Sequence, residues 1–73
     1  MQTLQNIRPG KTVTVLRVVG EGALKCRLME MGLTCGTRVT VRKTAPFGDP
    51  IEVNVRGYSL SLRKQDAALV EVI

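Results

Sequence analysis

Histidine and tryptophan are absent from the 73-residue chain, and aromatic residues make up only 3% of it. The missing histidine removes the commonest general base and metal ligand of proteins. One Phe and one Tyr are also too few for a surface on which nucleic acid bases stack. No apolar run approaches the roughly 18 residues of a membrane span, and residues 1–10 hold no signal-peptide core. We therefore expect a cytoplasmic protein without membrane insertion.

Cysteine is scarce as well. Cys26 and Cys35 are too few for a disulfide scaffold and do not form a CxxC pair. A metal site would need both thiolates and a carboxylate such as Glu30. The simpler interpretation is that one thiol is buried and the other lies in a loop. Neither cysteine has a paired base, and the six acidic residues are scattered. We predict no catalytic residue, no metal site, no cofactor and no hydrolase activity, GTP hydrolysis included.

Positive charge, by contrast, is abundant. Eleven Lys and Arg residues against six Asp and Glu give a net charge of +5, which suits an acidic partner. Arg38, Arg42 and Arg56 are expected on the outer face of strands, where a solvated surface is the simpler interpretation. The charge keeps one alternative function open, a small basic β-barrel that binds nucleic acid, although the shortage of aromatic residues argues against a nucleic acid partner.

Alternation of β-branched and polar residues predicts strands at residues 12–19, 37–43, 51–56, 58–63 and 69–73. A turn-rich loop with two prolines spans residues 45–50, Gly57 allows a tight hairpin, and residues 64–68 form a short turn or a single helical turn. About five short strands in so short a chain must close on themselves to cover their apolar faces. The predicted fold is a single domain, residues 1–73, that is all-β with one short helix: an SH3-like barrel.

The one helix is predicted over residues 23–31, where good helix formers follow a glycine-rich corner. Leu24, Leu28 and Met31 fall on one stripe that is expected to face the core. Gly32 stands where a left-handed C-cap belongs, with the next residue, Leu33, placed to fold back on the last turn. Residues 26 and 29 lie on the opposite side of the helix. Either they form an exposed apolar contact, or the helix is buried on both faces.

Three motifs resemble the FeoA family. Residues 27–33 (RLMEMGL), followed by Gly36, Val39 and Val41, resemble its RLxxMGLxxGxxVxV pattern; residues 45–50 (APFGDP) resemble its APxGDP loop; and residues 57–67 resemble its GxxLxLRxxxA segment. Cys35 departs from the family, which usually has proline there. The family-motif residues are Leu28, Met31, Gly32, Leu33, Gly36, Ala45, Pro46, Gly48, Asp49, Pro50, Gly57, Leu60, Leu62 and Arg63.

The resemblance implies a small cytosolic SH3-like protein that serves bacterial ferrous iron uptake. Its implied partner is FeoB, a membrane iron transporter with a cytosolic GTP-binding domain, whose assembly, GTP hydrolysis or transport the family would modulate. For the surface that meets this partner we expect Lys25, Cys26 and Met29 on the outer side of the helix, together with Phe47 at the tip of the proline-rich loop. The competing interpretation buries Met29 and Phe47 in the core.

Overall fold

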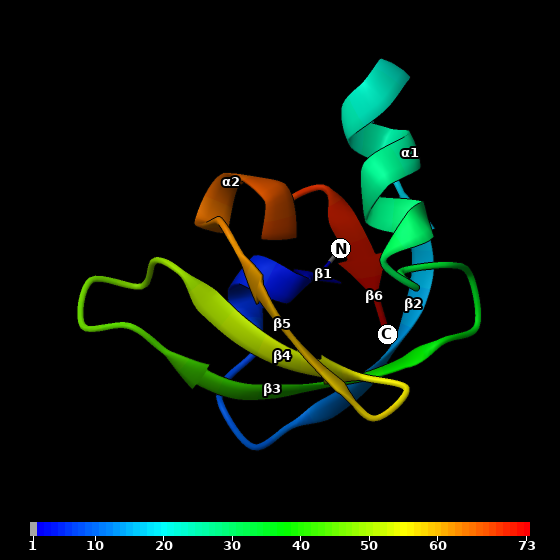
Figure 1. Cartoon of the computed structure of the whole chain (residues 1–73). Helices are drawn as coiled ribbons and strands as arrows, with labels where there is room; N and C mark the ends of the chain where they lie inside the picture. The colour runs from blue at the N-terminus through cyan, green and yellow to red at the C-terminus, as the bar shows by residue number, and fades with distance from the viewer. Residues whose placement is uncertain (1) are drawn as a thin grey trace.

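The computed structural model describes residues 2–73 and follows the predicted order of strands and helix (Figure 1). The predicted strands and helix are found within about one residue of their expected bounds, and one element pair at the N-terminus is additional. In order, the elements are β1 (Gln2–Thr3), the 3₁₀ helix η1 (Leu4–Asn6), β2 (Thr12–Val18), α1 (Gly22–Glu30), β3 (Arg38–Thr44), β4 (Ile51–Val55), β5 (Tyr58–Leu62), α2 (Lys64–Ala67) and β6 (Val70–Val72).

All strand pairs in the described chain are antiparallel, in the order β1-β6-β2-β3-β4-β5. The long strand β2 belongs to both halves of this sheet. Its first residues, Thr12 to Thr14, pair with β3, whereas Val15 to Val18 pair with β6 across a register shift. Because a bulge bends a strand and increases its twist, the sheet curls into a small barrel instead of lying flat.

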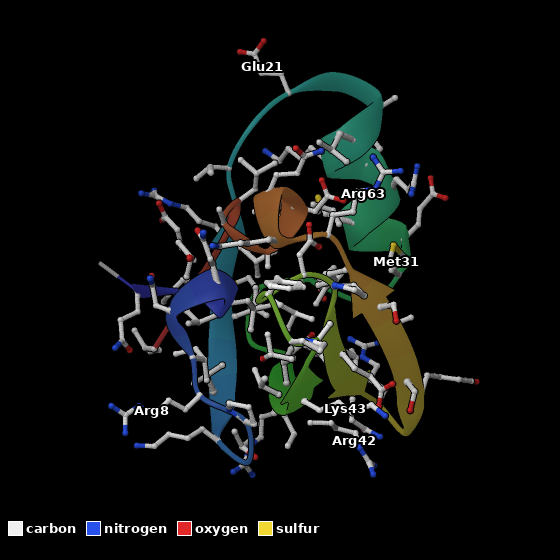
Figure 2. All side chains as sticks on the ribbon, turned by 90° about the vertical axis from the view of Figure 1, so that its left-hand side faces the viewer. Arg8, Glu21, Met31, Arg42, Lys43 and Arg63 are labelled. Atoms are coloured by element: carbon white, nitrogen blue, oxygen red, sulfur yellow. The ribbon has the colours of Figure 1, made fainter. Side chains whose placement is uncertain are left out.

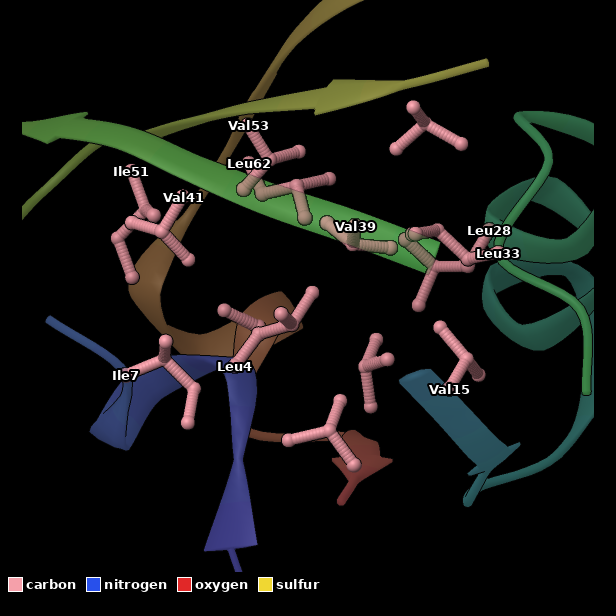
Figure 3. Packing of buried hydrophobic residues seen from close by; sticks show 14 of the residues in the cluster. Leu4, Ile7, Val15, Leu28, Leu33, Val39, Val41, Ile51, Val53 and Leu62 are labelled. Carbon is pink, nitrogen blue, oxygen red and sulfur yellow. The ribbon is translucent and has the colours of Figure 1, made fainter. Parts of the chain in front are cut away.

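The barrel interior is filled by the inward residues that the alternation predicted (Figure 3). In β4, for example, Ile51, Val53 and Val55 are buried while Glu52 and Asn54 are only half-buried. Fully burying one such side chain stabilises a fold by about 1.5–3 kcal/mol, which is why the pattern dictates the register. The buried apolar residues are Leu4, Ile7, Val15, Val18, Leu28, Leu33, Val39, Val41, Ile51, Val53, Val55, Leu62, Ala67, Val70 and Val72.

The N-terminal segment, residues 2–7, contributes to the core. Neither β1 nor η1 was predicted, because this segment is mostly polar. Leu4 is completely buried and Ile7 is 9% exposed. The Asn6 Oδ1 atom accepts hydrogen bonds from the backbone N–H and the hydroxyl of Thr3, at 3.1 and 3.2 Å, which fixes the turn. Helix η1 contacts α2, so these two short helical turns cover the side of the barrel between the outer strands.

The predicted cap of α1 is present. The Leu33 N–H donates to the Leu28 carbonyl at 3.2 Å and the Gly32 N–H to the Met29 carbonyl at 3.0 Å, the two bonds of a Schellman motif. Gly32 has a φ of +102°, and Leu33 is fully buried beside Leu28 (Figure 3). The left-handed glycine therefore turns the chain from the helix back into the core.

Leu24, which was predicted to face the core, is exposed, and so is Tyr58 in β5. In the helix stripe only Leu28 is buried; Met31 is half-buried and Leu24 is 38% exposed, because the N-terminal turn of α1 extends away from the barrel (Figure 1). In β5, Leu62 is buried and Leu60 half-buried, whereas Tyr58 is 72% exposed. Tyr58 begins the outermost strand directly after the hairpin turn, so only its partner Val55, which is buried, lies beside it in the sheet.

Candidate functional site

The outer side of α1 carries the first group of predicted partner-binding residues, Lys25, Cys26 and Met29, here called the α1 face. Cys26 is exposed, Met29 is 42% exposed and Lys25 is half-buried. The helix is therefore not buried on both faces. One buried thiol was expected, but both Cys26 and Cys35 are exposed. An exposed methionine beside an exposed cysteine forms a small, adaptable apolar contact.

The second predicted element is the loop Ala45–Pro50 between β3 and β4. Its base is closed by a hydrogen bond from the Ala45 N–H to the Pro50 carbonyl at 3.0 Å, and Gly48 N–H donates to the Ala45 carbonyl at 2.8 Å. The Asp49 carboxylate accepts the Lys64 N–H at 3.0 Å, which ties the loop to the start of α2. Phe47 is 94% exposed at the tip, so it does not belong to the core.

The structure does not bring the α1 face and the loop together. The loop lies at one side of the barrel and α1 rises from the other (Figure 1). A partner that contacts both must therefore reach around the barrel, or it contacts them one at a time. The sequence pattern predicted that both groups are exposed, but it could not predict the distance between them.

Several of the family-motif residues support the fold. Asp49 is an example, because its carboxylate accepts the backbone N–H of Lys64 at the start of α2. Sequence reasoning did not assign that role, and no local pattern links residues 49 and 64. Of the motif, Leu28, Leu33 and Leu62 are buried; Met31, Gly32, Ala45, Gly48 and Leu60 are half-buried; Gly36, Pro46, Asp49, Pro50, Gly57 and Arg63 are exposed.

The outward arginines are solvated or satisfied locally. Arg38 and Arg42 are exposed, Arg42 Nε lies 3.9 Å from Glu52 Oε2, and Arg56 donates to the Thr37 hydroxyl at 3.3 Å. Arg8, Arg42 and Lys43 project from the end of the molecule opposite α1 (Figure 2). The two aromatic residues flank opposite ends of β4, in the loop before it and in the first position of β5. They therefore cannot form one stacking platform for bases.

Within residues 2–73, no group of three or more His, Cys, Asp and Glu side chains is placed to hold a metal ion. No helix in this part of the chain is long and apolar enough to cross a membrane. The hollow between the loop and α2 is open and lined by Gln5, Asp49, Pro50, Arg63, Lys64 and Gln65. This lining combines one carboxylate with two cations, which is a poor environment for a metal ion.

Ferrous iron should bind the isolated protein weakly, because two cysteines and scattered carboxylates do not supply a complete set of ligands. We expect anaerobic calorimetry to find no stoichiometric ferrous site of submicromolar affinity. Such a site, if found and then lost in the Cys26→Ser/Cys35→Ser double variant, would refute the prediction.

The small antiparallel barrel, bent at β2 and covered by two helical turns, places the chain in the class of SH3-like β-barrels. The same fold occurs, with a TM-score of 0.88 and 27% identity, in the zinc complex of FeoA from Stenotrophomonas maltophilia, described as a prokaryotic SH3 domain protein; the match covers 100% of this chain and 91% of that one. Residues 2–73 match the family model of the FeoA domain. The chain belongs to the FeoA family.

Two further relatives are similar to most of this chain. The solution structure of a FeoA protein from Chlorobium tepidum is 38% identical, with a TM-score of 0.89 over 97% of this chain and 68% of that one. A Porphyromonas gingivalis protein named as a fusion of Fe(2+) transport protein A and the Fe(2+) transporter FeoB is 38% identical over 69 residues. That match covers 94% of this chain but only 8% of the fusion protein's length.

Proposed function

We propose that this chain is a cytosolic accessory protein of bacterial ferrous iron uptake that binds the cytosolic part of a FeoB-type transporter. The observation that carries the proposal is the fusion relative, in which a segment 38% identical to this chain is part of one polypeptide with FeoB. A fusion keeps the FeoA segment next to the transporter, as expected of two proteins that bind each other. Membership of the FeoA family supports the same role.

The surface offers apolar contacts for a partner. α1 carries an exposed Met29 and the loop an almost fully exposed Phe47. Methionine and aromatic residues are enriched at protein–protein interfaces, so both side chains are candidate contacts. The partner would cover the α1 face and would contact the Phe47 loop at a second point.

The experiment is the binding of Met29→Asp and Phe47→Asp variants to the cytosolic part of a FeoB-type transporter. Each variant should bind more weakly by about 1–3 kcal/mol, or roughly 5- to 150-fold, as expected for a central contact. The free energy of unfolding of the free domain should change little for Phe47→Asp, because Phe47 is 94% exposed. Met29→Asp should cost about 1 kcal/mol, since Met29 is 42% exposed and a carboxylate in the last turn of α1 opposes the helix dipole.

Gln2→Asp is the control, since it adds the same charge at an exposed position of β1, outside both the α1 face and the Phe47 loop. The proposal fails if neither variant weakens binding more than Gln2→Asp does. A large loss of thermal stability in both variants would instead mean that Met29 and Phe47 pack in the core. If only one variant weakens binding, the transporter contacts that side of the barrel alone.

The net charge of +5 also suits nucleic acid, which is the alternative function. Its signature would be a steep decrease of oligonucleotide affinity with salt, because each neutralised phosphate releases counterions. The separation of the two aromatic residues by β4 favours the protein partner.

A further inference from the structure

Strand β5 is an open edge of the sheet. It pairs with β4 on one side and is the last strand in the sheet order. An edge strand presents backbone donors and acceptors that another chain can pair with. The opposite edge, β1, has only two residues, whereas β5 has five. The sheet therefore has one short edge and one long edge.

The register of the β4–β5 hairpin identifies the free backbone groups. The turn residues Arg56 and Gly57 both have positive φ, +51° and +84°, as a type I′ hairpin requires. Val55 and Tyr58, which flank the turn, then form a hydrogen-bonded pair, and such pairs recur at every second position. The N–H and C=O groups of Ser59 and Ser61 consequently point away from β4. No turn, loop or side-chain hydrogen bond within residues 2–73 engages these groups.

Natural proteins usually protect a long edge with a charged residue, a proline or a bulge. β5 has the sequence YSLSL, which contains neither charge nor proline, and its register with β4 shows no irregularity. By contrast, the β2–β6 and β3–β4 pairs both contain register shifts. Ser59 and Ser61 are exposed, so an incoming strand would reach their backbone groups without displacing part of the fold.

The charges around β5 indicate which kind of chain can pair with its edge. The stretch from residue 53 to residue 65 contains three basic residues, Arg56, Arg63 and Lys64, and no acidic one. They lie at the two ends of β5. The nearest cross-strand carboxylate, Glu52, is beside Arg42. At the other end, Asp49 accepts the Lys64 N–H, but Arg63 and Lys64 together outnumber this one carboxylate. In a symmetric antiparallel β5–β5 dimer centred on Leu60, Arg56 of each copy would face Lys64 of the other. Like charges opposite each other destabilise such pairing, and two copies of net charge +5 repel each other.

We propose that the β5 edge binds an extended, acidic-flanked peptide segment of a partner protein by strand addition. The segment pairs with the N–H and C=O groups of Ser59 and Ser61, and its terminal carboxylates lie near Arg56 at one end and Arg63 and Lys64 at the other. The C-terminal end of α1 lies close to the hairpin end of this strand, since Gly32 packs against Val55. This site does not depend on the transporter as partner and is separate from the α1 face.

The test uses the whole chain, ¹⁵N-labelled, and the end-blocked peptide Glu-Val-Thr-Val-Thr-Val-Glu as probe. At millimolar peptide, the amide resonances of Ser59 and Ser61 should shift and their hydrogen exchange should slow. The matched peptide with lysine in place of both glutamates should bind several-fold more weakly. Ser61→Pro removes one edge-facing N–H without touching the β4 ladder, and should reduce affinity on the order of tenfold. Ser61→Ala keeps that N–H and should bind like the parent protein.

A second measurement leaves the protein unchanged. A Glu-flanked peptide N-methylated at all seven residues has no edge with free N–H donors, so it should lose binding even if Ser61→Pro fails to fold. The proposal is overturned if the shifts fall outside β5, if the lysine peptide binds as well as the glutamate peptide, or if N-methylation has no effect. Concentration-dependent dimers that the Glu-flanked peptide does not dissociate would overturn it as well, since a second copy would then occupy the edge.

Discussion

Gly32→Val should cost the domain about 2–6 kcal/mol of its free energy of unfolding. Gly32 has a φ of +102°, a conformation in which a β-branched residue is strained by about 1–3 kcal/mol. A Cβ atom at this position would also lie 3.3 Å from Val55 Cγ1, and such overpacking costs about 1–3 kcal/mol more. Against a total stability of roughly 5–15 kcal/mol, this loss is a large fraction. Urea denaturation followed by circular dichroism measures the loss.

Gly36→Val separates the two contributions. Gly36 also has a positive φ, +88°, but a Cβ atom there would meet nothing within 4 Å. It should therefore show the backbone strain alone, about 1–3 kcal/mol. An unchanged melting temperature for Gly32→Val would mean that Gly32 is not left-handed in solution, and equal losses in the two variants would mean that Val55 adapts at no cost.

Leu4→Ala should destabilise the domain by about 2–5 kcal/mol, the usual cost of removing a buried leucine side chain. Leu4 is completely buried in η1, the turn that contacts α2 and β6. Its loss leaves a cavity at the point where the two helical turns cover the barrel (Figure 3). The same denaturation experiment gives the magnitude.

Gln5→Ala is the matched control, because Gln5 is the next residue of η1 and is exposed. It should change stability by less than about 0.5 kcal/mol. A loss below about 1 kcal/mol in Leu4→Ala would show that the N-terminal turn frays away from the barrel and contributes little to the core.

The strands and the helix cap could be predicted because their signals are local. Strict alternation in β4, with Ile51 and Val53 inward and Glu52 outward, allows only one register once one face is buried. The Gly32–Leu33 pair predicts its own geometry, since few residues other than glycine adopt the left-handed conformation without strain.

The remaining features depend on contacts that no local pattern encodes. Leu4 is buried because α2 and β6, more than sixty residues later in the chain for most of their length, pack against η1. Leu24 fits the helical stripe but is exposed, since the pattern does not say how far α1 extends beyond the barrel. In the same way, the exposure of Met29 and Phe47 could be predicted, but their placement on different sides of the molecule could not.

The pairing of β1 with β6 has a consequence for the nascent chain. Gln2 pairs with Val72, and Val15 in the middle of β2 pairs with Val72 as well. While the ribosome is still synthesising β5, the first strand has no neighbour and half of β2 has none. Because domains fold as units during synthesis and long-range pairing must pay its loop-closure entropy first, the barrel closes only after β6 has emerged. Until then the unpaired half of β2 and its apolar side are accessible to chaperones.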